Sequence, residues 1–314
     1  MHPIPRCTAT RLLVFTTQLL MSAGILLGSA AGQSGESASP KEPPDARPPA
    51  AAFQNAIPAD QLAFLNDYAG RPAKELTKDK RFRNLMKLSV PRTVYHYGRD
   101  MGLTDATESV VFGSHLPVVV RDGRYVTVAG KEGPYLEGRG FLWFDMKEGL
   151  ALGGVYFHPI NGEPTPTLAI FSRQLSQNSL GMSQLPLAFA EDVSQWSAEM
   201  RLPPISPRYF IPENGKKYVL LHDEDYCDHP ANAPPPPEAS CQQMNADAAD
   251  ADMNAAEFMA QSHNAANATA WALRPEQVTW IGFRDQTCRV GPNRVGCQIR
   301  MTRQRTRVLL GQHG

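Results

Sequence analysis

The sequence predicts an α+β protein: an antiparallel sheet domain with packed helices, followed by a small disulfide-linked all-α module of three helices. Two observations support this fold class. Between residues 116 and 221, short apolar stretches with a period of two alternate with Gly-containing turns, as in adjacent antiparallel strands. After residue 238, apolar and small residues recur at helical spacing and cysteines are frequent. The length of 314 residues allows about two domains at roughly 150 residues each.

The first 31 residues have the layout of a secretory signal peptide. Arg6 and Arg11 precede a mainly apolar run over 12–27, and small residues follow with a cleavage position near Ala30. We therefore expect a periplasmic or secreted mature protein. The alternative is an uncleaved anchor, in which case the leader would be the membrane contact; its apolar run is short for a span and is interrupted by polar residues.

Two segments rich in proline divide the rest of the chain. Residues 32–57 combine Pro, Ala and Ser with little to bury, which predicts a disordered linker. Residues 231–237 contain four consecutive prolines, which fit neither a helix nor a central strand. These segments predict an α+β domain of unknown function over 58–222 and a helical module over 223–314.

Helical spacing and strand alternation place the elements of the α+β domain in order. Helices are predicted over 59–69, 80–88, 104–112 and 187–200. Strands are predicted over 116–120, 124–129, 141–146, 155–157, 167–171, 208–211 and 218–221. Asp-Gly at 122 and Asn-Gly at 161 and 214 supply hairpin turns. We expect the helix over 187–200 to pack on one face of the sheet.

The α+β domain offers little recognisable chemistry. It has no G-x-S-x-G elbow, no Gly-rich phosphate loop and no H-E-x-x-H pair, so we expect no catalytic residue, no cofactor and no metal. The segment of this domain that most suggests a functional site is the predicted hairpin tip with His158 and Glu163. These two residues would be an acid/base pair in an envelope enzyme, or part of a loop that enters a partner's cleft. The favoured interpretation is a stiff surface turn.

The charge of the whole chain hides an asymmetry. Lys plus Arg number 31 and Asp plus Glu number 31, so the chain lacks the excess of basic residues that is typical of nucleic-acid-binding proteins. Without the leader's two arginines, 31 − 2 = 29 cations face 31 anions. Residues 223–261 hold nine acidic residues and no Lys or Arg, whereas residues 262–314 hold eight Arg and two acidic residues. The acidic part would steer a basic partner, or the two parts simply pair with each other.

Three helices are predicted in the C-terminal module, over 238–263, 275–288 and 294–310. Pro275 suits the first turn of the second helix. Residues 222–229 contain several side chains that can bind a metal ion, but their spacing fits no standard metal-binding loop. A solvated acidic linker is the favoured interpretation.

Four cysteines remain once Cys7 leaves with the leader. Cys227, Cys241, Cys288 and Cys297 form an even set, which in an oxidising compartment predicts two disulfides; a zinc site suits a reducing compartment better. Up-down-up packing would bring all four to one end of the helices. Three connectivities remain open, and we favour Cys227 with Cys288 and Cys241 with Cys297.

One motif in the second helix resembles a known family. The spacing L-x3-Q-x2-W-x3-R-D-x2-C, together with an upstream D-x-x-L-N-like segment, resembles the lysozyme-inhibitor LprI-like N-terminal domain over about residues 226–311. The residues that carry it are Leu273, Gln277, Trp280, Arg284, Asp285 and Cys288, with Asp250, Met253 and Asn254 upstream. This resemblance implies a small disulfide-linked helical module of the bacterial envelope whose named member inhibits lysozyme. Residues 58–222 resemble no family that we recognise.

The resemblance also implies a partner and a binding face. The partner would be a lysozyme or muramidase-type protein, with peptidoglycan as a further one, and the chain would inhibit by occlusion, including as an immunity protein. Candidate contact residues are Gln277, Trp280, Arg284, Asp285, Asp250 and Asn254, with His158 and Glu163 in the sheet domain. The alternative for Arg284 and Asp285 is that they fix neighbouring helices through charge-assisted bonds. A non-inhibitory envelope scaffold is the alternative function.

Overall fold

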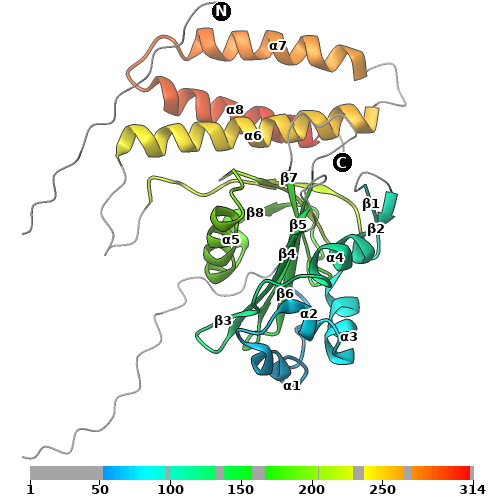
Figure 1. The fold of residues 1–314 in the computed structure, drawn as a ribbon. Helices are drawn as coiled ribbons and strands as arrows, with labels where there is room; N and C mark the ends of the chain where they lie inside the picture. The colour runs from blue at the N-terminus through cyan, green and yellow to red at the C-terminus, as the bar shows by residue number, and fades with distance from the viewer. Residues whose placement is uncertain are drawn as a thin grey trace, which may run out of the picture. The chain divides into compact units, whose positions relative to one another are not determined.

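The computed structural model describes residues 52–96, 100–131, 138–157, 167–203, 205–228, 237–264 and 270–311. The predicted leader and the hairpin tip with His158 and Glu163 lie outside these residues. The described residues belong to one compact unit and form a sheet, the helices packed on it and three C-terminal helices (Figure 1). Residues 52–57, at the end of the predicted linker, already contact the sheet domain, since Phe53 bridges Leu175 and Ile57 is buried.

The central sheet has eight strands in the order β3-β4-β5-β6-β7-β9-β10-β8. Their bounds are β3 Val119–Arg121, β4 Tyr125–Lys131, β5 Arg139–Asp145, β6 Leu150–Phe157, β7 Thr167–Phe171, β8 Leu180–Gly181, β9 Pro207–Ile211 and β10 Tyr218–Leu221. The expected antiparallel pairing is confirmed from β3 to β7 and for β9 with β10. The pairs β7–β9 and β10–β8 are parallel, so the sheet is mixed. A long crossover connects β7 to β9, and such a connection permits parallel pairing.

Seven short helical segments and a small hairpin accompany the sheet. They are α1 Ala59–Leu62, η1 Ala63–Tyr68, α2 Ala73–Leu76, α3 Lys80–Ser89, α4 Leu103–Val111, η2 Met182–Gln184 and α5 Leu187–Glu199, with β1 Val94–His96 and β2 Asp100–Gly102. The predictions for α3, α4 and α5 are confirmed. The single helix expected over 59–69 is instead a short α-helix followed by a 3₁₀ helix. Asp122 and Gly123 adopt positive φ values of 55° and 62°, as the predicted two-residue hairpin turn requires.

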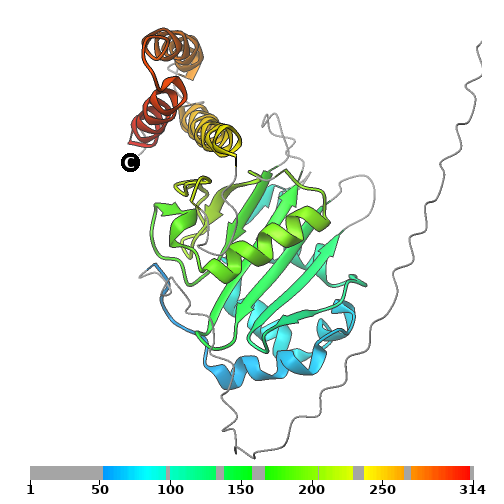
Figure 2. The same cartoon turned by 90° about the vertical axis from the view of Figure 1, so that its left-hand side faces the viewer.

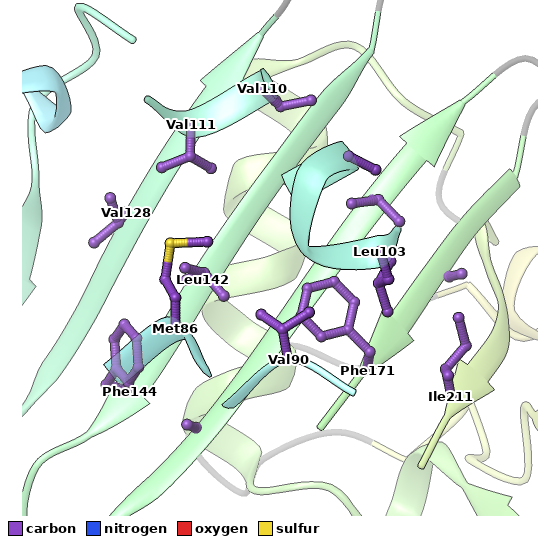
Figure 3. Close-up of a cluster of buried hydrophobic side chains, with 14 of the residues drawn as sticks. Met86, Val90, Leu103, Val110, Val111, Val128, Leu142, Phe144, Phe171 and Ile211 are labelled. Atoms are coloured by element: carbon purple, nitrogen blue, oxygen red, sulfur yellow. The ribbon is translucent and has the colours of Figure 1, made fainter. Parts of the chain in front are cut away.

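Helices cover both faces of the sheet (Figure 2), and each face buries a separate core. On β5, Leu142 and Phe144 pack under α3 and α4, as Figure 3 shows, whereas the alternate residue Trp143 packs under α5. This alternation follows from the period of two along a strand. Gly130 on β4 permits the close approach of α4, because a Cβ there would lie 2.0 Å from the carbonyl oxygen of Val110.

The C-terminal helices are α6 Glu238–Asn264, α7 Ala270–Thr287 and α8 Arg294–Gly311. α8 runs alongside α6, and α6 packs on β9 and β10, where Lys217 lies over the rings of Tyr209 and Phe258. Helix α7 begins five residues earlier than predicted, so Pro275 lies inside it. A proline at this depth removes one backbone hydrogen bond of the helix. Within the described helices, none combines the length and apolarity needed to cross a membrane.

Candidate partner-binding site in the C-terminal helices

Arg284 on α7 joins the three C-terminal helices. Its side chain is buried, and Nη1 donates hydrogen bonds to Oδ1 of Asp250 on α6 at 2.7 Å and to Oγ1 of Thr302 on α8 at 2.8 Å. Nε donates to Oδ1 of the neighbouring Asp285 at 3.0 Å. The planar fork of a guanidinium suits such divergent acceptors. Arg284 therefore holds the module together and offers little surface to a partner.

A second buried arginine repeats this role from α8. Arg305 Nε donates to Oε1 of Gln277 at 2.9 Å, and Nη2 donates to Oε1 of Glu276 at 2.7 Å. The ring of Trp280 lies 5.7 Å from Cζ of Arg284 and 5.8 Å from Cζ of Arg305. Two cation–π contacts thus fix the orientation of this half-buried indole.

Asp285 is held as an anion at the edge of this network. Partial burial raises its pKa, but hydrogen bonds from Gln298 and Arg284 and the nearby charge of Arg294 outweigh burial and lower the pKa below its ordinary value. Gln298 Nε2 donates to the same Oδ1 atom at 3.0 Å that Arg284 Nε contacts. The carboxylate is 44% exposed, so it still faces solvent.

A buried pair connects the sheet to α6. His222 follows β10; its Nδ1 lies 2.6 Å from Oδ1 of Asp252, and its backbone N–H donates to Oδ2 at 2.8 Å. The interpretation of this segment as a solvated linker is therefore wrong for His222, which packing against α6 buries. Nearby, the backbone N–H of Tyr226 donates to Asn245 Oδ1. Burial, with the negative charges of Glu224 and Asp252, raises the pKa of Tyr226 to about 12.

Both expected disulfides form, but the favoured pairing is wrong. The bonds are Cys227–Cys241, with Cα atoms 4.9 Å apart, and Cys288–Cys297, with Cα atoms 5.5 Å apart. Asn245 gives the reason for the first bond, because it binds the segment around Cys227 and lies one turn after Cys241 on α6. The second bond closes the connection between α7 and α8.

The exposed apolar surface of α7 lies beside the predicted motif. Gln277 and Arg284 of that motif are buried, whereas Phe283 is 59% exposed and Trp280 is half-buried. Residues three apart are neighbours on a helix surface, so Trp280 and Phe283 lie on the same side of α7; we call these two residues the aromatic pair. Asn254 is exposed on α6.

Three features of this region escaped sequence reasoning: the role of Arg305, the exposure of Phe283 and the pairing of Asp252 with His222. A usable signal existed for Arg305, which lies close to the apolar stripe of α8 and so needed a buried partner. Across the described segments, no three His, Cys, Asp or Glu residues gather as metal ligands would.

Comparison with known proteins supports the resemblance seen in the motif. No curated protein and no solved structure matches the chain. A family model does match the C-terminal part of the chain, which contains helices α6, α7 and α8, the Arg284 network and the aromatic pair. The C-terminal region of the chain, residues 230–309, matches the lysozyme inhibitor LprI family.

Proposed function

We propose that this protein is an exported inhibitor of lysozyme or of another peptidoglycan-cleaving enzyme, and that it binds and occludes its target without catalysing a reaction. The observation that carries this proposal is the match of residues 230–309 to the lysozyme inhibitor LprI family. An immunity protein that protects the cell from a neighbouring cell's muramidase would act by the same inhibition. Two disulfides and the predicted leader support a periplasmic or secreted location.

The aromatic pair is the proposed centre of the contact surface. Aromatic side chains dominate binding energy at protein interfaces, and Phe283 presents most of its ring to solvent. Trp280 is held from behind by the guanidinium groups of Arg284 and Arg305. A ring that is fixed before binding loses less conformational entropy when the partner arrives.

Carboxylates next to the aromatic pair favour a basic partner. Asp250, Glu276 and Asp285 each contact an arginine of the network, yet their side chains are 49%, 56% and 44% exposed. Many lysozymes are basic, so these groups and the acidic stretch over 223–257 would speed association. We expect the association rate to fall as salt rises.

An inhibition assay with matched variants tests this proposal. The oxidised chain from residue 32 should slow lysozyme-driven clearing of a peptidoglycan suspension at stoichiometric amounts. Phe283→Ala should weaken inhibition by about 30-fold, the loss typical of an interface hot spot. Val278→Ala is the control, because Val278 is 66% exposed on α7 but lies away from the aromatic pair; it should inhibit like the wild type.

Two results would contradict the proposal in different ways. If no lysozyme or muramidase is slowed while the protein still sediments with peptidoglycan, the chain is an envelope scaffold and not an inhibitor. If inhibition is strong but both variants inhibit equally, the function stands and the aromatic pair is not its contact surface.

A further inference from the structure

One side of α8 carries a row of arginines, which we call the arginine row: Arg300, Arg303 and Arg307. Their spacing of three and four residues places them on one side of the helix. Arg300 and Arg307 are exposed, whereas Arg303 is partly buried and donates to the carbonyl oxygen of Glu224. α8 contains no acidic residue. Within the described part of the chain, neither Arg300 nor Arg307 forms an ion pair.

Helix α3 provides an internal comparison, because Lys80, Arg83 and Lys87 repeat the same spacing and are all exposed. On α3, however, Glu108 of the adjacent α4 interacts electrostatically with Arg83 and Lys87. On α8, Arg303 lies near Asp225, whose pKa its charge lowers, so Arg300 and Arg307 are the two exposed guanidinium groups of the row that no described carboxylate pairs with. These two guanidinium groups are available to an external anion.

We propose that the arginine row binds the phosphate groups of an anionic phospholipid surface. Guanidinium groups bind phosphate through two parallel hydrogen bonds. The row extends over about 10 Å along the straight helix axis, so its exposed guanidinium groups can face a flat layer of headgroups together. Val308, beside Arg307, is 45% exposed and supplies an apolar side chain that can enter the headgroup region.

This inference is independent of the proposed inhibition. A basic lysozyme would be repelled by the arginine row, so the row and the aromatic pair serve different partners. A protein exported through the predicted leader meets a phospholipid surface as it leaves the membrane. A helix with basic and apolar groups on its solvent side is typical of binding at such a surface.

Vesicle sedimentation tests the proposal with the oxidised chain from residue 32. The protein should sediment with vesicles of phosphatidylglycerol and phosphatidylcholine, should remain in solution with phosphatidylcholine alone, and should be released by salt. Each arginine near the surface contributes about 5-fold in affinity, so Arg300→Gln with Arg307→Gln should lose about 25-fold. Arg307→Gln alone should lose about 5-fold. Lys80→Gln with Lys87→Gln removes the same charge at the same spacing and should bind like the wild type.

The controls separate the possible outcomes. Both arginine side chains are exposed, so the double variant should keep the wild-type circular dichroism spectrum and lysozyme inhibition. An equal loss of affinity in the two double variants would show that net charge, not the arginine row, drives binding. Binding to soluble dextran sulfate without binding to anionic vesicles would overturn the assignment to a lipid surface in favour of an anionic polymer.

Discussion

Replacing Asp252 by alanine should cost this protein about 4 kcal/mol of its free energy of unfolding. The carboxylate accepts two buried hydrogen bonds, from Nδ1 of His222 at 2.6 Å and from the backbone N–H of His222 at 2.8 Å. Its removal leaves both donors buried without this partner. A buried donor left unsatisfied costs about 1–3 kcal/mol, so two cost about 2–6 kcal/mol, with about 4 as the central value.

Two further variants turn this magnitude into a test. Asp252→Asn keeps one acceptor oxygen and should therefore lose about half as much, about 2 kcal/mol. Asp247→Ala removes an exposed carboxylate from the same helix, whose partner is Gln243 on that helix, and should change stability by less than about 0.5 kcal/mol.

Urea unfolding, followed by circular dichroism and tryptophan fluorescence, measures all three variants. Coincidence of the two signals would show that the sheet and α6 unfold together, as a shared buried pair requires. Equal losses in Asp252→Ala and Asp247→Ala would refute the reasoning, because the exposed and the buried carboxylate would then contribute alike.

Three other predictions concern local features. The folded-state pKa of Tyr226, about 12, exceeds the ordinary tyrosine value of 10.0. Stability from the neutral phenol is therefore complete below pH 10 and is lost toward pH 12, and Tyr226→Phe should reduce that alkaline loss by up to about 2 kcal/mol in urea titrations. Non-reducing peptide mapping should find Cys227 bonded to Cys241 within one tryptic peptide, since no cleavable Lys or Arg separates them; a link to another peptide would contradict the observed pairing. Gly130→Ala should lower stability by about 3 kcal/mol in thermal melts, because its Cβ would meet the backbone of α4, whereas Gly113→Ala meets no atom within 4 Å and should be neutral.

Much of the fold could be predicted because its signals are local. The alternation along β5 and the Asp122-Gly123 turn each depend on a few consecutive residues, and the structure confirms both. The parallel pairing of β7 with β9 could not be predicted, because it depends on where the crossover through α5 returns the chain. Two-residue β8 carries too few residues for any periodicity.

In the candidate site, too, local features could be predicted and contacts between distant residues could not. Trp280, Arg284 and Asp285 were found because they share one helix and one motif. The bonds from Arg305 to Gln277 and from His222 to Asp252 join residues 28 and 30 positions apart, on different elements. The spacing of residues within one helix does not show how two helices are aligned along each other. These contacts and the burial of Gln277 are therefore visible only in the structure.

The pairing of the cysteines has a consequence for how the protein is made. Each cysteine bonds to the next one along the chain, across separations of 14 and 9 residues. If the chain is exported with the N-terminus first, as the proposed function requires, Cys227 and Cys241 both emerge before Cys288. Such an order of emergence would favour the observed bonds, whereas interlaced pairs would require exchange between disulfides after the first bond has formed.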